Sequence, residues 1–438
     1  MKYAELDAGS LARIRDEAAE KLKEYGERHL SLDLTRGKPG RSQLDLTEGM
    51  LTALSSGKDC KDEDGLDCRN YGLLDGLPEA KRLFSDLLGI PAERIIVGGN
   101  SSLNMMYDAL ARLMIYGAGA GYVPYAKQEK LKFLCPTPGY DRHFAITRSL
   151  GIEMIPIEMR RDGPDMDAVR EAVKDPAVKG MWCVPKFSNP DGITYSDRVV
   201  DEIAALEPAA GDFRVFWDNA YAVHELYDVE VPLADIFAAA KKYGHEDMIY
   251  YFASTSKITF PGSGVAIFAA SDANVAFVKK IMSAQTIGFD KLNQLRHVRY
   301  FGSADGIRAQ MKQHAALIRP KFEIVLQSFR RELPDTGAHW TEPLGGYFVS
   351  LYVMPGTARR VYELAGQAGV KLTAAGSAFP GGIDPNDSHL RIAPTYPDTE
   401  DVALAVEILC ECVKLAAAEK TLKETQGCFC KSTPNDAK

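Results

Sequence analysis

The chain has 438 residues, 46% of them hydrophobic and 26% charged, which is typical of a folded globular protein and excludes a disordered chain, a collagen and a coiled coil. The 52 basic and 60 acidic residues give a net charge of −8. A mildly acidic chain lacks the basic surface by which proteins bind nucleic acid or anionic membranes, so we expect neither partner.

The N-terminal 26 residues are charged and have a helical pattern, without the apolar core of a secretory signal. No stretch approaches 18 consecutive apolar residues, so no membrane span is expected. The 8 cysteines are sparse for a chain of this length, and Cys135 and Cys183 lie in apolar segments where reduced thiols pack well. These features indicate a cytoplasmic protein in a reducing compartment.

Short apolar segments alternate with amphipathic helical patterns through the middle of the chain. The expected strands are Arg94–Gly98, Lys132–Cys135, Glu153–Ile157, Gly180–Val184, Phe213–Trp217, Met248–Phe252 and Val265–Ala269. Strands separated by helices indicate βαβ units and a mainly parallel sheet with helices on both faces. We therefore expect an α/β fold whose large domain, residues 45–318, contains a mainly parallel seven-stranded sheet.

The pattern changes in the last third of the chain. A long helical segment is followed by a hairpin pattern at His339–Tyr352, a strand at His389–Ile392 and a helix at Thr399–Glu419. We expect these elements to form a smaller α+β domain from residues 1–44 and 319–425. The polar residues 426–438 are expected to form a disordered tail. Cys428 and Cys430 in this tail have no neighbouring ligand in the sequence, so no metal site is expected.

Small residues follow the first expected strand. In open α/β sheets, ligands bind beyond the carboxyl ends of the strands. The segment Gly98-Gly99-Asn100-Ser101-Ser102 lies between a strand and a helix, where backbone N–H groups and the helix N-terminus favour a phosphate. Taken alone, the same segment is better explained as a tight strand-to-helix turn with a serine or asparagine cap.

Chemically distinctive side chains follow the other strands: Tyr140, Asn189, Asp218, Tyr221, and Lys257 with Ser254 and Ser256. Together they match the needs of pyridoxal 5'-phosphate. Its aldehyde requires a lysine for a Schiff base, and its pyridine nitrogen requires a carboxylate that keeps it protonated. The ring hydroxyl needs hydrogen-bond donors, the ring needs an aromatic neighbour, and the phosphate needs hydroxyls and a small-residue loop.

These residues lie in motifs that run from about Leu34 to Glu419. The motifs are Gly37-Lys-Pro-Gly40, Asn70-Tyr71-Gly72, Gly99-Asn-Ser-Ser102, Pro138-Gly-Tyr140, Asn189-Pro-Asp-Gly192, Asp218-Asn-Ala-Tyr221, Ser254-Thr-Ser-Lys257 and Leu390-Arg391-Ile392. In order and spacing, the chain resembles the fold type I, class I aminotransferases, which depend on pyridoxal phosphate. It is most similar to their divergent Ic branch of aspartate aminotransferases.

The resemblance implies a role for each of these positions. Lys257 resembles the lysine that binds the cofactor and moves the proton, and Asp218 the acid paired with the pyridine nitrogen. Asn189 and Tyr221 match the groups that bind the ring hydroxyl, and Asn189 also faces the substrate. The remaining positions match the stacking aromatic residue (Tyr140), the histidine that supports the acid (His143) and the phosphate-binding groups (Asn100, Ser101, Ser102, Ser254, Ser256).

The substrate and the assembly are also implied by the resemblance. Arg391 resembles the arginine that binds the substrate α-carboxylate, and Gly37 the backbone element that faces it. Tyr71 matches a tyrosine that reaches the phosphate from the partner subunit, which implies a homodimer with shared active sites. The sequence departs from the family pattern in one respect: relatives carry a phosphate-binding arginine shortly after the lysine, whereas Lys257–Val265 contains none. Ser263 and the glycine amides of this segment are the candidate substitutes.

The expected reaction is transfer of an amino group from an L-amino acid, by resemblance aspartate, to a 2-oxo acid such as 2-oxoglutarate, by a ping-pong mechanism. An acidic side chain on the substrate requires a second cation, for which the candidates are Arg36, Lys38, Lys186 and Lys291 of the partner subunit. Two alternatives remain open. One is a β-lyase or decarboxylase that uses the same lysine and acid; the other, less favoured, is a non-catalytic sensor of the kind found in some transcription regulators.

Overall fold

The structure, a computed structural model, describes residues 2–429. The described chain forms two compact units. The smaller unit contains the described parts of Met1–Gly40, Ile318–Pro343 and Tyr347–Lys438, and the larger unit contains Arg41–Leu317 and Leu344–Gly346. Residues 430–438, and with them Cys430 and most of the tail expected to be disordered, lie outside the described residues.

The larger unit is built on a sheet that has eight strands within residues 2–429, in the order β2-β9-β8-β7-β6-β3-β4-β5. The strands are β2 (Ile95–Val97), β3 (Lys132–Thr137), β4 (Glu153–Arg160), β5 (Gly163–Pro164), β6 (Val178–Cys183), β7 (Arg214–Asp218), β8 (Ile249–Ser254) and β9 (Ala266–Ala269). The central pairs are parallel, whereas β2–β9, β8–β9 and β4–β5 are antiparallel. The predicted mainly parallel sheet is therefore confirmed, but the prediction of seven strands was one strand short of the eight that the described residues form. β5 has two residues, which is too short to leave an apolar pattern in the sequence.

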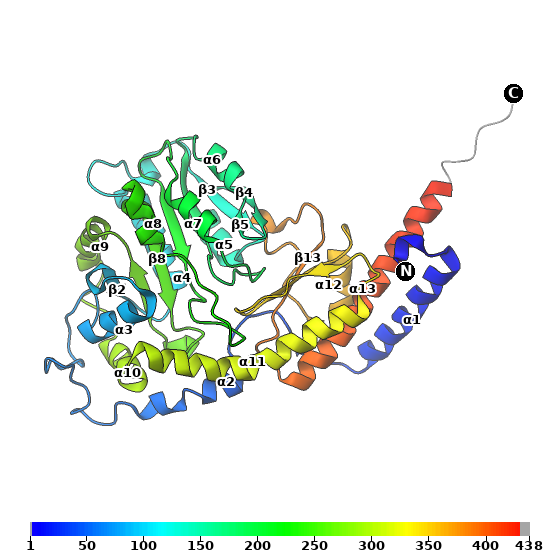
Figure 1. The fold of residues 1–438 in the computed structure, drawn as a ribbon, viewed down its shortest axis with the longest axis horizontal. Helices are drawn as coiled ribbons and strands as arrows, with labels where there is room; N and C mark the ends of the chain where they lie inside the picture. Colours follow the sequence, from blue (N-terminus) through cyan, green and yellow to red (C-terminus); the bar gives the residue numbers. More distant parts are fainter. Residues whose placement is uncertain (1, 430–438) are drawn as a thin grey trace. The chain divides into compact units, whose positions relative to one another are not determined.

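Helices cover both faces of this sheet (Figure 1). The helices whose side chains pack on one face are α3 (Pro78–Leu88), α6 (Met166–Ala172), α7 (Asp197–Ala204), α8 (Ile236–Tyr243) and α10 (Lys291–Phe301). Those that pack on the other face are α4 (Ser102–Tyr116), α5 (Asp141–Ser149) and α9 (Asp272–Gln285). Burial of one large apolar side chain contributes about 1.5–3 kcal/mol, so the two cores together stabilise the three-layer arrangement.

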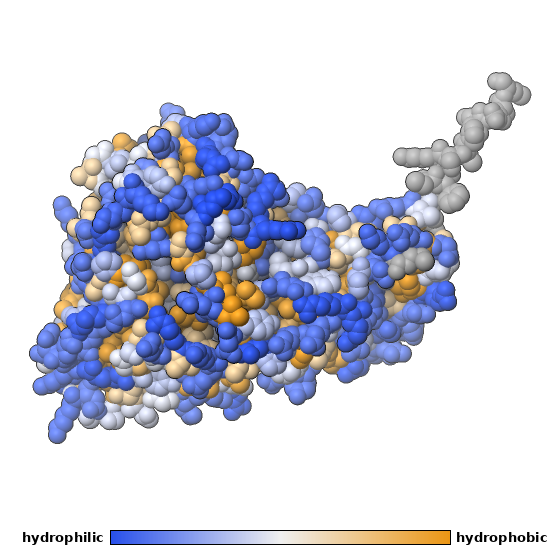
Figure 2. Space-filling model, in the orientation of Figure 1, coloured by the Kyte–Doolittle hydropathy of each residue, from blue (hydrophilic) through white to orange (hydrophobic). Residues whose placement is uncertain are grey.

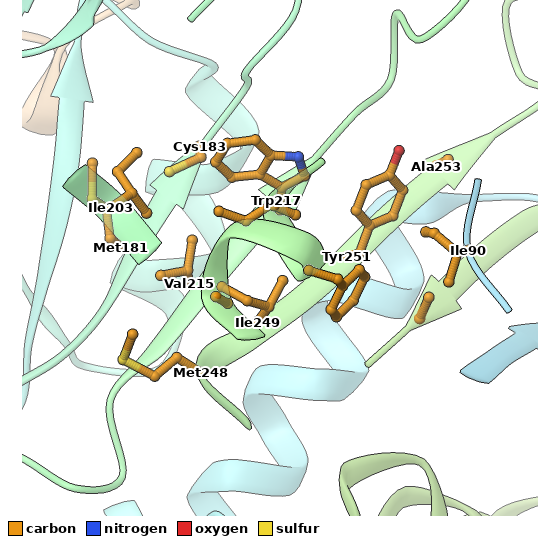
Figure 3. Close-up of a cluster of buried hydrophobic side chains, with 14 of the residues drawn as sticks. Ile90, Met181, Cys183, Ile203, Val215, Trp217, Met248, Ile249, Tyr251 and Ala253 are labelled. Atoms are coloured by element: carbon orange, nitrogen blue, oxygen red, sulfur yellow. The ribbon is translucent and has the colours of Figure 1, made fainter. Parts of the chain in front are cut away.

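Successive strand residues point to opposite faces of the sheet, and this alternation positions the site. In β7, Phe216 packs in the core beneath α4 and α5, whereas Trp217 packs in the opposite core. Figure 3 shows Trp217 with Val215, Ile249 and Tyr251 of β7 and β8 in the latter core. Asp218 therefore follows Phe216 onto the face that α4 and α5 cover.

The smaller unit combines helices with two small sheets. Its strands are β1 (Leu32–Asp33), paired in parallel with β12 (Val370–Lys371), and the antiparallel β10 (His339–Trp340), β11 (Val349–Tyr352) and β13 (His389–Ile392). Its helices are α1 (Ala8–Glu27), α12 (Ala358–Gln367) and α13 (Thr399–Phe429). Leu11 of α1 packs against Ala417, Ala418 and Leu422 of α13. The helix α13 runs a few residues into the segment expected to be disordered.

Two α-helices of the described residues remain, besides short 3₁₀ turns. The short α2 spans Arg41–Asp45, and α11 spans Ala304–Glu332, within which the chain passes from the larger to the smaller unit. Hydrophilic and hydrophobic residues are interspersed on the visible surface (Figure 2). Across residues 2–429, none of the helices combines the length and the apolar character needed to cross a membrane.

Candidate active site

The carboxylate of Asp218 lies at the end of β7 and is almost fully buried, with 3% of the residue exposed. Its Oδ2 lies 3.1 Å from Nε2 of His143 on α5. Its Oδ1 is also buried and has no hydrogen-bond partner among the described residues. A buried carboxylate oxygen is costly unless it accepts a hydrogen bond, so this oxygen is suited to a donor that a ligand brings.

Neighbouring side chains fix the ring of His143. It stacks on Trp182 with ring centroids 4.4 Å apart and an interplanar angle of 10°. The Trp182 indole N–H in turn donates to the Thr147 hydroxyl at 2.8 Å. The ring of Tyr140, the residue before α5, contacts the His143 ring edge-on, with the ring centroids 5.0 Å apart. The stacked and hydrogen-bonded rings hold the imidazole against Asp218.

Lys257 follows β8, the strand next to β7 in the sheet. Its Nζ lies 4.8 Å from the centroid of the Tyr221 ring. Burial lowers the pKa of Lys257 below the ordinary lysine value, while the Asp218 carboxylate acts in the opposite direction. A lowered pKa makes the neutral amine more available, as a nucleophile or proton acceptor requires. Tyr221 and Asn189 are also buried, at 2% and 5% exposed.

The segments predicted to bind phosphate lie together. The Asn100 amide donates to the Gly262 carbonyl at 3.2 Å, and the Ser256 hydroxyl donates to the Asn100 carbonyl at 3.3 Å. The Ser254 hydroxyl is 3.1 Å from that of Ser256. Ser101 caps α4, and Ser102 is the first residue of this helix. Ser263 belongs to the same turn as Gly262. The tertiary structure thus joins the helix N-terminus of α4 to the loop that carries Lys257.

One face of α10 packs on the loop that carries Lys257, a contact that no motif in the sequence predicts. The Asn293 amide donates to the Gly264 carbonyl at 2.7 Å, and Nη2 of Arg296 lies 3.4 Å from the Ser263 carbonyl oxygen. Nε2 of His297 lies 3.2 and 3.0 Å from the Thr255 and Thr259 hydroxyls. The spacing 293, 296, 297 marks a single helix face, but nothing in the sequence indicates what that face contacts.

Arg391 lies in β13 of the smaller unit and is largely buried. Its Nη2 is 3.4 Å from the Thr35 carbonyl oxygen and 3.1 Å from the Thr373 hydroxyl. The guanidinium carbon lies 4.9 Å from the centroid of the Phe348 ring. Gly37 adjoins the same ring, because a Cβ built at this position would lie 2.5 Å from Phe348 Cζ. A glycine at position 37 is therefore required for this packing.

The candidates for a second substrate-binding cation differ in their contacts. Lys186 forms an ion pair with Glu225, and Lys291 donates to the Gly72 carbonyl at 3.0 Å. Lys38 Nζ lies 3.7 Å from the centroid of the Tyr396 ring, and Arg36 is exposed. The Glu225 carboxylate compensates the charge of Lys186, which makes Lys186 the weakest candidate.

A cavity of about 770 Å³ in the larger unit is lined by Lys186 and Glu225 but lies apart from the predicted catalytic groups. Its lining includes Trp217, Asn219 and Tyr251 but not Lys257, Asp218 or Tyr221. Strand alternation explains the separation, because Trp217 faces away from the side of the sheet that bears Asp218. The size of a cavity is therefore a poor guide to the reactive groups of this chain.

The α/β sheet, with an acid and an amine at neighbouring strand ends, is that of an aminotransferase. The sequence model of the family described as "Aspartate amino-transferase" matches residues 6–425, and the chain belongs to this family. The aspartate aminotransferase of Corynebacterium glutamicum is 47% identical over 416 residues, which cover 95% of this chain and 96% of that protein.

Solved structures agree with this assignment. The crystal structure of an aspartate transaminase from Corynebacterium glutamicum superposes with a TM-score of 0.93 at 46% identity, covering 96% of this chain and 99% of that chain. The alpha-aminoadipate aminotransferase of Thermus thermophilus, solved with N-(5'-phosphopyridoxyl)-L-leucine, shares the fold, with a TM-score of 0.72 at 20% identity and coverage of 92% and 98%. Pyridoxal phosphate is the cofactor that membership of the family implies.

Proposed function

We propose that this aminotransferase moves the amino group of an L-amino acid, aspartate, to a 2-oxo acid, 2-oxoglutarate, by a ping-pong mechanism with pyridoxal 5'-phosphate. The observation that carries the proposal is the buried Asp218 carboxylate. One of its oxygens contacts His143, and the other lacks a partner among the described residues. A protonated pyridine nitrogen is a donor of the kind that this oxygen requires.

The other side chains fit the same cofactor. Lys257 would bind its aldehyde, Tyr221 and Asn189 its ring hydroxyl, and Tyr140 its ring face. Its phosphate would be held by the polar groups of two adjoining segments, namely Asn100, Ser101, Ser102, Ser254, Ser256 and Ser263. When bound, pyridoxal phosphate supplies the carbonyl that takes up the amino group and a ring that withdraws electrons.

Each protein group then has a defined task. Asp218, oriented by His143, keeps the pyridine nitrogen protonated. The Lys257 amine, whose pKa is lowered by burial, accepts the proton from the substrate Cα and later returns it. Arg391 binds the α-carboxylate through its planar guanidinium. The Phe348 ring packs on this guanidinium, and the absence of a side chain at Gly37 leaves room for the ring.

Exchange of the amino group is tested with a matrix of amino donors and 2-oxo acids, assayed with added pyridoxal phosphate. We expect aspartate and 2-oxoglutarate to be converted to oxaloacetate and glutamate. Borohydride reduction followed by peptide mapping should place the cofactor on Lys257. Lys257→Ala should abolish both signals, whereas Lys280→Ala, which removes an exposed lysine on α9, should change neither. Release of ammonia or carbon dioxide instead of exchange would indicate a lyase or a decarboxylase.

We also propose that the active species is a homodimer in which Tyr71 serves the partner's site. Tyr71 is 81% exposed in the single chain, and Ile287 is 62% exposed. Contacts between Gly72 and both Gly288 and Lys291 hold these two segments side by side, so they present one apolar patch suited to a second copy. An active monomer in sedimentation would contradict this assembly.

A cytoplasmic location is the remaining part of the proposal. The Cys68 amide donates to the Cys60 carbonyl at 2.8 Å, yet both thiols are free. Neighbouring free thiols are typical of a reducing compartment. Cell fractionation with an antibody against the protein tests this location.

A further inference from the structure

The side chains expected to surround the cofactor phosphate carry no charge. They are the amide of Asn100 and the hydroxyls of Ser101, Ser102, Ser254, Ser256 and Ser263. A phosphate ester carries about −1.5 to −2 charges at neutral pH. Such a charge is costly to bury next to neutral donors alone, so a cation nearby would stabilise it substantially.

Arg296 is held against the turn that forms one side of this region. Its Nη2 lies 3.4 Å from the Ser263 carbonyl oxygen and 2.5 Å from the Asn293 amide oxygen. The preceding residue of the turn, Gly262, accepts a hydrogen bond from Asn100 at 3.2 Å. Asn100 and Arg296 therefore contact adjacent carbonyls of one turn.

The charge of Arg296 has no counter-ion within the described part of the chain. No carboxylate there lies within 4.0 Å of it, and its Nε is buried without a hydrogen-bond partner. Arg112, which lines a small hollow with Asn100 and Ser101, differs because it lies 3.6 Å from Asp108. A partly buried guanidinium that has no carboxylate partner is stabilised when an anion binds beside it.

The helix that carries Arg296 is fixed in position. His297 contacts the hydroxyls of Thr255 and Thr259 through Nε2, and its Nδ1 lies 2.7 Å from the Asn293 carbonyl oxygen. Asn293 also donates to the Gly264 carbonyl. These bonds tie α10 to the loop of Lys257 on both sides of Arg296, so the guanidinium is presented by a rigid support rather than a mobile loop.

We propose that Arg296 supplies the positive charge for the cofactor phosphate, in place of the arginine that is absent from Lys257–Val265. The inference rests on the proposed function, because it assumes that pyridoxal phosphate binds at Lys257. It adds a residue that neither the sequence motifs nor the family resemblance indicated.

The test compares ligands with and without the phosphate. Apoenzyme of the wild type and of Arg296→Gln is titrated with pyridoxal 5'-phosphate and with pyridoxal, and binding is followed by absorbance. We expect Arg296→Gln to raise the Kd for pyridoxal phosphate by roughly tenfold to a hundredfold, the scale of a hydrogen bond to a charged group. The Kd for pyridoxal should not change. Inorganic phosphate should compete with pyridoxal phosphate less effectively in the variant.

Arg308→Gln is the matched control. It removes an arginine of the same unit that is about half exposed and pairs with Asp305 on α11. This substitution should not change the binding of pyridoxal phosphate, pyridoxal or inorganic phosphate. If Arg296→Gln does not fold, Arg296→Lys replaces it. Loss of the planar guanidinium should still weaken the binding of pyridoxal phosphate several-fold relative to the binding of pyridoxal.

The outcomes separate the two proposals. An equal change for both ligands, or no change for either, overturns the role of Arg296 while leaving the cofactor assignment intact. Wild-type protein that fails to bind pyridoxal phosphate at Lys257 overturns the proposed function, and this inference with it.

Discussion

The regions around Lys257 and Arg391 are organised in different ways. Lys257 and Asp218 stand at the ends of strands that are neighbours in a parallel sheet, in which Asp218 is paired in register with Phe252. Arg391 instead lies inside the antiparallel strand β13, opposite Ser350. Its hydrogen-bond partners, Thr35 and Thr373, are 356 and 18 residues away in sequence.

The difference shows two ways of placing a reactive group. In the larger unit, the parallel strands end at the same edge of the sheet. The groups that follow these strands therefore lie close together, irrespective of the sequences of the helices between them. In the smaller unit, side-chain packing against Phe348 and hydrogen bonds from distant segments orient one arginine. Changes in the first region should therefore alter cofactor chemistry, and changes in the second should alter substrate affinity.

Among substitutions that leave the cofactor bound, the largest effect is expected for Asp218→Asn. An amide cannot keep the pyridine nitrogen protonated, so kcat should fall roughly a hundredfold to a thousandfold, the scale of losing one preorganised charged group. The cofactor should stay bound, as its absorbance would show. Asp201→Asn, which removes a partly exposed acid of α7 that pairs with Lys242, is the control. Near-normal turnover would remove Asp218 from this role.

A smaller effect is expected for Arg391→Lys. A point charge cannot replace the planar guanidinium, so KM for every amino donor should rise by roughly tenfold to a hundredfold. Donors with acidic and with apolar side chains should be affected alike, because the α-carboxylate is their common feature. The spectrum of the bound cofactor should not change. Arg359→Lys, at an exposed position near Asp387, is the control. A loss confined to acidic donors would show instead that Arg391 binds the side chain.

The smallest effect concerns stability at acid pH. Burial lowers the pKa of His297 from 6.5 to about 4. Below pH 6.5 the unfolded chain binds a proton that the folded chain does not, so the free energy of unfolding falls as the pH falls toward 4. Between pH 6.5 and pH 5 this amounts to about 1.6 kcal/mol.

His297→Gln should remove this contribution, so the free energy of unfolding of the variant should fall by about 1.6 kcal/mol less than that of the wild type over that interval. Urea unfolding at pH 6.5 and pH 5 measures the difference. Buried His389, in the smaller unit, has its pKa lowered to about 3 and should retain its own pH dependence in the variant. Identical pH dependence in wild type and variant would contradict the neutral state of His297.

The strands of the larger unit were largely predictable from sequence, because buried parallel strands leave continuous apolar segments. The predicted strands at Arg94–Gly98 and Val265–Ala269 fall within a residue of β2 and β9. The two-residue β5 was missed, since it has too few residues for any pattern. The apolar segments also mark where each strand ends, so the polar residues that follow them could be selected as candidate site residues.

By itself the sequence therefore determined the α/β class and which polar groups follow its strands, from Asn100 to Lys257, whereas the order of these groups along the sheet edge came from the strand order of the fold. Tertiary structure alone decided which oxygen of Asp218 lacks a partner among residues 2–429, which face of α10 lies against the Ser263 turn, and which side chains orient Arg391. The physical reason is that periodic burial is a local property, repeated along each element and visible in the sequence. A hydrogen bond between residues many positions apart leaves no such repeat, and only the folded chain brings its donor and acceptor together.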